Sequence, residues 1–473
     1  MIFPQKTLLL INPWIFDFAA YDLWSKPLGL LYLASFLRKQ GFHIEYIDCL
    51  DKYAETNFPK IKRYGIGNFR REIVAKPKIL SHIQRHYARY GMSEDIFRKI
   101  LKEIAAPDAI LITSMMTYWY LGPQRVSEIV RQMFPKVPII LGGIYATLLP
   151  EHAKQVIQPD FIVEGPGEEK LLAILADLFK INPGTFHLAD SIDDYPYPAF
   201  DLVSHPNYLI VMTSRGCPFN CTFCAQKQIS MAFIQRNPDK VVQEVIYQFR
   251  KFRIRDFAFY DDALFVNPNR HIKVILKKII ELDIPVRFHT PNGLFASMID
   301  AELAELMYRA GFKTIRLSFE TVNENRRQDM AGKISNIGIK TAVNHLVNAG
   351  YDPGDLAAYV IMGLPDQQLD EIISSIFFVN NLGVQVKLAS YSPIPGTKDF
   401  QRALNKGILS NDMDPLLSNN SIFPLVSSST EFEAYRKLRI LAQMLNATTK
   451  KHIIPSTVKP IESILKSIPK RIQ

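Results

Sequence analysis

Short apolar runs alternate with amphipathic stretches through the first third of the chain. Such runs are typical of strands buried on both faces, and the stretches between them place apolar residues at helical spacing. The predicted strands are residues 7–12, 43–48, 109–113, 138–141 and 160–163, and the predicted helices are residues 29–40, 93–104 and about 125–133. This alternation predicts a doubly wound, Rossmann-like α/β domain with a parallel sheet over residues 1–180.

A second alternation begins after residue 208. The predicted strands are residues 209–213, 256–260, 286–289, 314–319, 357–362 and 385–390, with helical stretches at 238–252 and 301–310. Six such units over residues 209–400 predict a partial, TIM-like (β/α)6 barrel, whose catalytic groups gather at the carboxyl ends of the strands. Residues 181–208 are rich in Pro and Asp, which predicts a linker. Residues 401–473 contain two amphipathic stretches, 429–445 and 459–468, and predict a small, mainly helical region.

Composition narrows the class of protein. The chain has 473 residues, of which 48% are hydrophobic, and this is ordinary for a globular protein of two or three domains. No apolar run reaches the about 20 residues that are needed to span a bilayer. The start, MIFPQKTLLLINP, lacks the pattern of a secretory signal, so we expect a cytoplasmic protein.

The basic charge is concentrated in two segments. The formal net charge is +10, and an insertion at residues 51–100 holds 12 Lys and Arg against 5 Asp and Glu. Residues 401–473 hold 11 against 5, so the rest of the chain is slightly acidic. A basic surface suits nucleic acid, a membrane surface or an acidic electron donor such as a flavodoxin, and solvated helical faces explain the charge equally well.

Three of the four cysteines, Cys217, Cys221 and Cys224, fall within eight positions in the run SRGCPFNCTFCAQ. A structural zinc site needs four ligands, and the nearest histidines, His205 and His271, lie outside the run. Disulfides need an oxidising compartment, which nothing in the sequence indicates. Three thiolates instead suit a 4Fe-4S cluster whose fourth iron is left open to bind and reduce a small molecule.

The spacing of this run resembles the CxxxCxΦC signature of the radical SAM superfamily, with Phe223 as the aromatic residue before the last cysteine. The resemblance implies that the open iron binds the amino and carboxylate groups of S-adenosylmethionine, and that one electron splits this molecule to a 5′-deoxyadenosyl radical. It also implies a partial barrel with the cysteine loop after its first strand, and an electron donor of the flavodoxin or ferredoxin type. The cofactor performs such radical chemistry, and the protein positions it.

The same resemblance assigns contacts with S-adenosylmethionine to the ends of three further barrel strands. The expected contacts are Asp261 and Asp262 with the methionine amino group, Ser318 and Glu320 with the ribose, and Ile361, Met362 and Gly363 with the adenine. Carboxylates suit an ammonium group, and a glycine permits close approach. Each has a plainer alternative: a helix N-cap for the aspartates, a surface salt bridge for the glutamate and a turn for the glycine.

The carboxyl ends of the first set of strands resemble the cobalamin-binding domain that precedes many radical SAM cores. Ser114-Met115-Met116 matches that family's Ser-x-Leu signature, with Met for Leu, and a glycine pair followed by Tyr-Ala-Thr matches the segment that lines the nucleotide tail. The resemblance assigns cobalamin contacts to Asn12, Trp14, Ser114, Met115, Met116, Gly142, Gly143, Tyr145, Ala146, Thr147, Glu164 and Gly165. The Asp-x-His-x-x-Gly signature is absent after the first strand, so no histidine there would ligate cobalt from below. A degenerate domain that binds nothing is the alternative.

These resemblances imply a cobalamin-dependent radical SAM enzyme, most often a methyltransferase that acts on an unactivated carbon of a small-molecule or macromolecular substrate. Ring formation and rearrangement occur in the same family. RNA modification, as in the methylthiotransferases, is disfavoured because those enzymes carry three more cysteines before the core, and only Cys49 is found there. Cys49 is expected to be a core residue. A non-catalytic corrinoid-binding protein would have no use for the cysteine loop.

Overall fold

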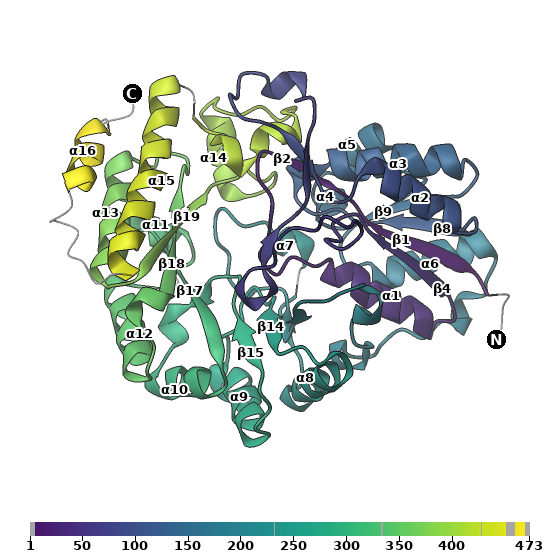
Figure 1. Ribbon diagram of the computed structural model, residues 1–473, viewed down its shortest axis with the longest axis horizontal. Coiled ribbons are helices and arrows are strands. Elements are labelled where there is room, and N and C mark those ends of the chain that lie inside the picture. The colour runs from purple at the N-terminus through teal and green to yellow at the C-terminus, as the bar shows by residue number, and fades with distance from the viewer. Residues whose placement is uncertain (1–4, 231, 333, 427, 451–458, 469–473) are drawn as a thin grey trace. The chain divides into compact units, whose positions relative to one another are not determined.

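The computed structural model describes residues 5–230, 232–332, 334–426, 428–450 and 459–468. The chain divides into two compact units. The first comprises Met1–Ile210, Gln228–Met231 and Asp414–Ser418, and the second comprises Val211–Lys227, Ala232–Met413 and Asn419–Gln473. Each unit contains its own parallel sheet with helices packed on it (Figure 1).

The sheet of the first unit has five parallel strands in the order β10-β9-β8-β1-β4. Its strands are β1 (Thr7–Asn12), β4 (His43–Asp48), β8 (Ala109–Ile112), β9 (Ile139–Gly142) and β10 (Phe161–Val163). Its helices are α1 (Leu28–Lys39), α2 (Glu94–Glu103), α3 (Leu121–Met133), α4 (Ile144–Leu148), α5 (Pro150–Ile157) and α6 (Glu168–Phe179). Leu8 and Leu10 of β1 pack with α1 and α6 on one face, and α2, α3 and α5 cover the other (Figure 1). The predicted doubly wound sheet is confirmed.

Chain order along this sheet reverses between β1 and β8. The strands on either side of this reversal lead to helices on opposite faces of the sheet, and ligands of open α/β sheets bind at the carboxyl edge beside such a reversal. This edge carries most of the residues that the sequence assigned to cobalamin.

The basic insertion is folded rather than a loose loop. It contributes β6 (Arg71–Ile73) and β7 (Ala88–Tyr90) to an antiparallel sheet with β2 (Ile15–Asp17), and β5 (Gly67–Asn68) pairs with β3 (Tyr21–Asp22). Part of its positive charge is neutralised internally. The Arg89 guanidinium is buried and pairs with Glu72 at 2.6 Å and Glu94 at 2.8 Å, and Lys52 is buried beside Asp22 at 2.5 Å.

The segment predicted as a linker, residues 181–208, packs onto the first unit. Ile181 and Ala199 belong to that unit's apolar core, and the Tyr208 hydroxyl donates to Asp22 at 2.6 Å. Its regular structure is limited to three short 3-10 helices, Pro183–Thr185, Ile192–Asp194 and Phe200–Leu202, so the segment is loop-like although it is anchored. Residues 414–418 also belong to the first unit, where Tyr120 donates its hydroxyl hydrogen to Asp414 at 3.2 Å.

The sheet of the second unit follows the chain order, β11-β14-β15-β17-β18-β19, as a partial barrel does. Its strands are β11 (Leu209–Val211), β14 (Asp256–Phe259), β15 (Arg287–His289), β17 (Phe312–Glu320), β18 (Leu356–Met362) and β19 (Gln385–Ser390), with short β16 (Leu294–Phe295) beside β17. Its helices are α8 (Pro238–Phe252), α9 (Ile272–Glu281), α10 (Ala301–Arg309), α11 (Glu324–Asp329), α12 (Asn336–Asn348), α13 (Leu369–Asn381) and α14 (Lys398–Asn405). All six predicted strands are confirmed, and α8, α9, α10, α12 and α13 lie on the outer face of the sheet (Figure 1).

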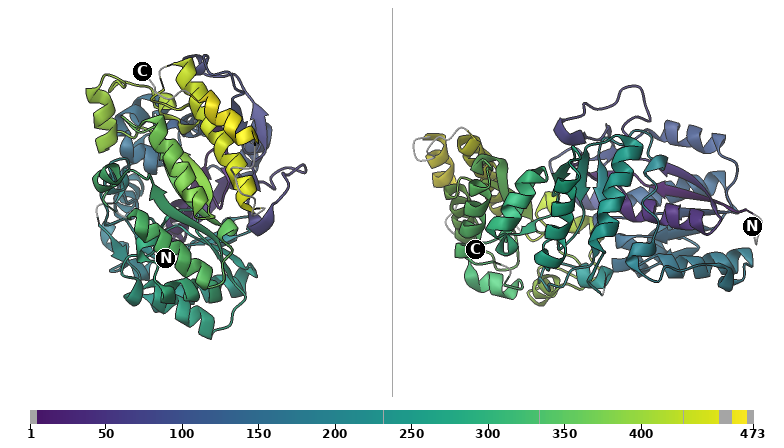
Figure 2. Two further views of the ribbon diagram at one scale, coloured as in Figure 1. Left: turned by 90° about the vertical axis from the view of Figure 1, so that its left-hand side faces the viewer. Right: turned by 90° about the horizontal axis from the view of Figure 1, so that it is seen from below.

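The C-terminal region is helical, as expected, with α15 (Ser429–Lys450) and α16 (Lys459–Ser467). Helix α15 lies along the edge strand β19 and beside α13 (Figure 2). The Asn446 side-chain amide accepts from Val386 N–H at 2.7 Å and donates to Val386 O at 2.8 Å. Exposed strand edges recruit other chains, and this pairing covers the edge. Among the described residues, no helix is long and apolar enough to cross a bilayer.

Candidate functional site

The three clustered cysteines lie on one loop after the first barrel strand. β12 (Ser214–Arg215) pairs antiparallel with β13 (Ile234–Gln235) and closes the loop at its base. Gly216 turns the chain with φ +79°, which a residue with a side chain adopts only under strain. Cys224 N–H donates to Cys221 O at 3.2 Å, and Cys224 is exposed while Cys221 is buried.

The cysteine loop fits a cluster better than a single metal ion. In the described part of the chain, no three His, Cys, Asp or Glu side chains converge on a point where one ion would bind. A cubane does not require such convergence, because each thiolate ligates a different iron. None of the four cysteines, all in described segments, forms a disulfide. Cys49 is fully buried, as expected of a core residue, and burial raises the pKa of its thiol well above the ordinary value.

Contacts that the sequence did not reveal hold this loop against the barrel. Thr222, between two of the cysteines, donates its hydroxyl hydrogen to the buried Asp399 at 2.7 Å, and Asp399 N–H donates back to Thr222 O at 3.0 Å. Phe219 stacks on Phe295 with ring centroids 4.2 Å apart. Phe223 packs on the apolar cluster at the end of β18. Thr222 and Asp399 are 177 positions apart, so no local pattern signals their pairing.

The two aspartates after β14 have different surroundings. Asp261 is buried and accepts hydrogen bonds from Thr213 N–H at 3.0 Å, the Thr213 hydroxyl at 2.7 Å and the Ser214 hydroxyl at 2.6 Å. Burial raises the pKa of Asp261, and the hydrogen bonds from Ser214 and Thr213 oppose the rise. Asp262 is exposed. The carboxylate of Asp261 therefore fixes the start of the cysteine loop, and only Asp262 keeps the expectation of a ligand contact.

Glu320 is the last residue of β17 and has an unusual backbone. Its φ is +71°, and Thr321 N–H donates to Phe319 O at 3.0 Å, so Glu320 is the central residue of a tight three-residue turn. This conformation is strained for a residue with a side chain, and such strain is found most often at functional sites. Ser318 lies two residues earlier, before an irregularity in the pairing of β17 with β18, and close to Gly293, where an added Cβ would be 2.3 Å from the Ser318 hydroxyl oxygen.

The end of β18 opens into a cavity. Gly363 turns the chain with φ +87°, and a cavity of about 550 Å³ is lined by Met362, Gly363, Ser390, Tyr391 and residues of the C-terminal region. Tyr435 of α15 is one of these, and its ring would lie 3.5 Å from a Cβ added at Gly363. Ile361 packs beneath the cavity in the cluster that contains Phe223.

Hydrogen bonds join the strand ends of the first unit around Ser114. The Ser114 hydroxyl donates to Gly142 O at 2.7 Å and accepts from Ala146 N–H at 3.2 Å. The Thr147 hydroxyl donates to Gly143 O at 2.8 Å and accepts from Gly165 N–H at 2.9 Å. The polar residues assigned to cobalamin thus position β8, β9 and β10 relative to one another.

The surface at this edge suits a large, partly apolar ligand. Met115 and Met116, which follow the central strand β8, are 37% and 42% exposed. Gly165 has φ +73° and no atom within 4 Å of the position of an added Cβ. Exposed adjacent methionines are adaptable apolar contacts. These residues and the exposed Glu164 fit a cofactor such as cobalamin.

Other residues assigned to cobalamin are buried inside the unit. The Asn12 amide donates to Asp48 at 2.7 Å, and the Trp14 indole donates to Met92 O at 2.8 Å. Tyr145 and Ala146 are fully buried. These four residues support the loops and do not offer their side chains to solvent.

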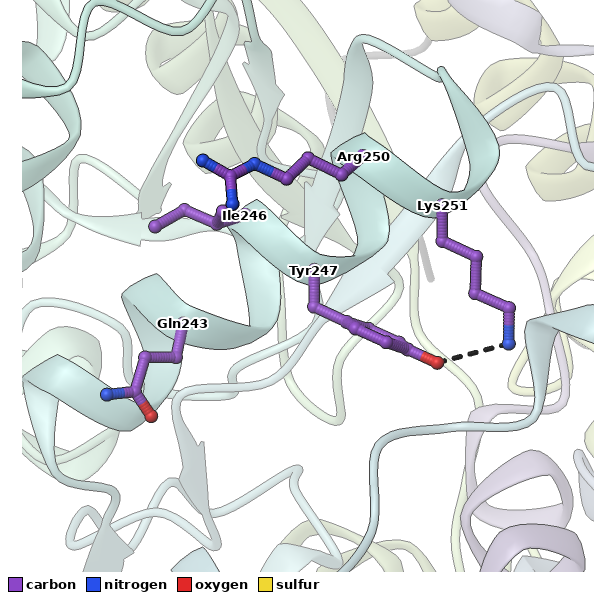
Figure 3. A pocket seen from close by; sticks show the side chains of 5 residues that line it. All are labelled: Gln243, Ile246, Tyr247, Arg250 and Lys251. Atoms are coloured by element: carbon purple, nitrogen blue, oxygen red, sulfur yellow. Dashed lines mark hydrogen bonds between the residues drawn. The ribbon is translucent and has the colours of Figure 1, made fainter.

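Another hollow lies on the outer face of α8 (Figure 3). It is lined by Gln243, Ile246, Tyr247, Arg250 and Lys251, with the Lys251 ammonium donating to the Tyr247 hydroxyl at 3.1 Å. Helix α8 runs from the carboxyl end of one barrel strand back to the start of β14, so its last turn lies at the amino edge of the sheet. The hollow is therefore remote from the cysteine loop.

Comparison with known families agrees with this geometry. The model of the Radical SAM superfamily matches residues 211–379, and the model of the B12 binding domain matches residues 79–175. The first begins within the strand that precedes the cysteine loop, and the second covers the carboxyl ends of β8, β9 and β10.

Individual relatives are named as methyltransferases or as anaerobic magnesium-protoporphyrin IX monomethyl ester cyclases. The chain is 26% identical over 357 residues to the uncharacterized methyltransferase PH0819 of Pyrococcus horikoshii, covering 67% of this chain and 75% of that protein. It is 22% identical over 471 residues to the cytidylyl-2-hydroxyethylphosphonate methyltransferase of Streptomyces wedmorensis. This match covers 86% of this chain and 83% of that protein. Its fold matches the radical S-adenosylmethionine methyltransferase TsrM from Kitasatospora setae, with cobalamin and a 4Fe-4S cluster bound, with a TM-score of 0.63 at 15% identity over 87% of this chain and 81% of that one.

Proposed function

We propose that this chain, which belongs to the radical SAM superfamily and carries an N-terminal B12-binding domain, is a methyltransferase acting on an unactivated carbon. The observation that carries the proposal is the three-cysteine loop at the carboxyl edge of the barrel sheet. The ends of β14, β17 and β18 lie at the same edge, because β14, β15, β17 and β18 run parallel. A relative matched over 86% of this chain is named as a methyltransferase, which supports methyl transfer, and the relatives named as cyclases make ring formation the second candidate.

The residues of the barrel supply binding and orientation. When bound, a cluster on Cys217, Cys221 and Cys224 would supply the electron for cleavage of S-adenosylmethionine. Asp262 offers an exposed carboxylate beside the loop, which suits the methionine ammonium. Glu320 projects from its strained turn at the end of β17, where a carboxylate would accept hydrogen bonds from ribose hydroxyls. Gly363 leaves the end of β18 accessible to a planar base.

The first unit supplies a surface for cobalamin. Met115 and Met116 would contact the apolar part of the cofactor, while Ser114 and Thr147 keep the surrounding strand ends in place. The loop between β1 and α1 contains no histidine, so it would offer no imidazole ligand to the cobalt of a bound cobalamin.

Anaerobic purification followed by reconstitution tests the proposal. We expect about four irons and one cobalamin per chain, and dithionite should then yield 5′-deoxyadenosine from S-adenosylmethionine. Transfer of isotope-labelled methyl from S-adenosylmethionine to a carbon of the product would identify methyl transfer. A product that is cyclised or rearranged without the label would overturn methyl transfer and retain the radical SAM assignment. Absence of iron and of 5′-deoxyadenosine would overturn both.

The proposal also includes a cellular compartment and an electron donor. Three thiolates that ligate a cluster need a reducing compartment, so we place the protein in the cytoplasm. We propose an acidic flavodoxin or ferredoxin-type donor, attracted by the exposed cations of the insertion, among them Lys62, Arg63 and Arg71.

A further inference from the structure

Glu371, in the first turn of α13, collects hydrogen bonds from two loops of the barrel. Its carboxylate accepts from the Thr321 hydroxyl at 2.7 Å, from the Asn323 amide at 3.3 Å and from Arg326 Nε at 2.9 Å; these donors lie in the segment after β17, Arg326 in the short helix α11. It also accepts from the Gln367 amide at 3.4 Å, in the loop after β18. The Glu371 side chain is only 9% exposed. Hydrogen bonds to a buried charged group are among the strong ones, so these bonds constrain both loops.

The bonds in the first loop act on the strained Glu320. Thr321 is fully buried and follows Glu320 directly. Its hydroxyl reaches Glu371, its N–H closes the three-residue turn, and its carbonyl accepts from Arg327 at 3.1 Å. The next residue, Val322, donates its N–H to Ser375 of α13 at 2.9 Å. A strained conformation persists where its surroundings over-determine it, and here both residues after Glu320 are fixed to α13.

The bonds in the second loop act on Gly363. Gln367 is buried, and its side-chain oxygen accepts from Gly363 N–H at 2.8 Å and from Leu364 N–H at 3.3 Å. Its side-chain nitrogen donates to Ile361 O at 3.0 Å as well as to Glu371. Arg326 crosses between the loops and donates to Pro365 O at 3.3 Å. The end of β18 is therefore held by the same network as the end of β17.

We infer that Glu371 is a positioning residue for S-adenosylmethionine, which fixes the loop carrying Glu320 and the loop carrying Gly363 in one binding-competent arrangement. The inference rests on the proposed function, because it assumes that these two strand ends hold that molecule. No motif in the sequence marks Glu371, and Glu371 is not among the residues that line the cavity at the end of β18.

The test is a set of three variants of the full-length, reconstituted protein. Glu371→Gln keeps the size of the side chain but replaces one carboxylate oxygen with an NH2 group. This group cannot accept the hydrogen bonds that Glu371 receives in the wild type. Thr321→Val leaves the Glu371 carboxylate in place and removes the hydroxyl that donates to it, which also accepts from Asn323 N–H at 3.1 Å. Glu302→Gln is the control for loss of an ion-paired carboxylate away from both loops: Glu302 accepts from Lys273 at 2.8 Å and Lys277 at 2.7 Å, lies on α10 and is half exposed.

Two readouts separate positioning from general stability. The dissociation constant of S-adenosylmethionine should rise about tenfold in Glu371→Gln and in Thr321→Val, which corresponds to about 1.4 kcal/mol of binding free energy. Iron content should equal that of the wild type, and Glu302→Gln should bind normally. Amide hydrogen exchange should accelerate in peptides covering residues 319–326 and 361–367 in Glu371→Gln, and in residues 319–326 alone in Thr321→Val.

Binding within about twofold of the wild type in both variants, or unchanged exchange in these peptides, overturns the inference. If Glu371→Gln does not fold, Thr321→Val decides by the same criteria. If the wild type binds no S-adenosylmethionine, the proposed function fails. The exchange pattern then still decides whether Glu371 fixes the two loops, and the assignment to S-adenosylmethionine is withdrawn.

Discussion

Replacement of Asp261 by alanine should destabilise the barrel and release the cysteine loop, whereas the same replacement at Asp262 should not. The Asp261 carboxylate is buried and accepts three hydrogen bonds from the two residues that lead into the loop, Thr213 and Ser214. Its neighbour is exposed. Asp261 is therefore a structural carboxylate, whereas the adjacent Asp262 is a candidate contact for S-adenosylmethionine.

The size of the destabilisation can be estimated from the hydrogen-bond donors that Asp261→Ala would leave without an acceptor. The Thr213 N–H cannot reorient, and a buried donor left unsatisfied costs about 1–3 kcal/mol. A hydrogen bond to a charged group contributes about 1.5–3 kcal/mol. The Thr213 and Ser214 hydroxyls can rotate toward other acceptors, so the loss of stability for each hydroxyl is smaller than this. Removal of a desolvated carboxylate offsets part of the loss, because burial disfavours the ionised form of Asp261. We expect a net loss of about 2–4 kcal/mol in the free energy of unfolding.

Thermal unfolding of the reconstituted protein, followed by calorimetry, measures this loss. For a domain of this size about 2–4 °C of midpoint corresponds to 1 kcal/mol, so the transition of the barrel should fall by about 5–15 °C in Asp261→Ala. Iron content should fall with it. Asp262→Ala should keep the midpoint and the iron but bind S-adenosylmethionine more weakly. An unchanged midpoint in Asp261→Ala, or equal destabilisation by both variants, would refute the reasoning.

Other predictions concern the cluster, the cobalamin and the electron donor. Cys221→Ala should lose the cluster and cleavage of S-adenosylmethionine under dithionite, and Cys49→Ala should keep both because Cys49 is a core residue; a full cluster in the first variant would contradict the ligand set. The electron paramagnetic resonance spectrum of bound cob(II)alamin should lack nitrogen superhyperfine splitting, and its presence would reveal an unexpected imidazole ligand. Charge reversal at the exposed Lys62 and Arg63 should slow turnover with flavodoxin in a salt-dependent way and leave dithionite-driven cleavage unchanged, whereas equal losses with both reductants would indicate a structural role.

The strands of the two main sheets were predictable from the sequence, because a buried strand requires a characteristic pattern of apolar residues. A strand covered on both faces needs a continuous apolar run, and all eleven predicted strands lie within about two residues of a strand in the structure. The short strands of the insertion went unpredicted. β6 (Arg71–Ile73) is exposed at all three positions, so it carries no alternation of apolar and polar residues.

The site was predictable only as far as local motifs extend. The cysteine spacing lies within one loop, and the strand ends follow from the barrel. The partners of those strand ends do not: Thr222 pairs with Asp399 from another element, and Glu371 receives donors from a loop about fifty positions earlier. Asp261 and Asp262 are adjacent and chemically identical, but in the folded barrel Asp261 is buried and Asp262 is exposed. The sequence alone does not distinguish them.

These contacts have a common physical reason. Loops at the carboxyl edge of a parallel sheet must leave surface for ligands, so apolar contacts such as Phe219 on Phe295 immobilise them only in part. In this barrel they are also held by buried polar side chains from neighbouring elements, Asp261 and Asp399 for the cysteine loop and Glu371 for the loops after β17 and β18. An unsatisfied buried donor costs more than a lost surface contact, so a few acceptors fix several loops. Substitutions of these acceptors should therefore impair ligand binding more than substitutions of exposed residues nearer to the cavity.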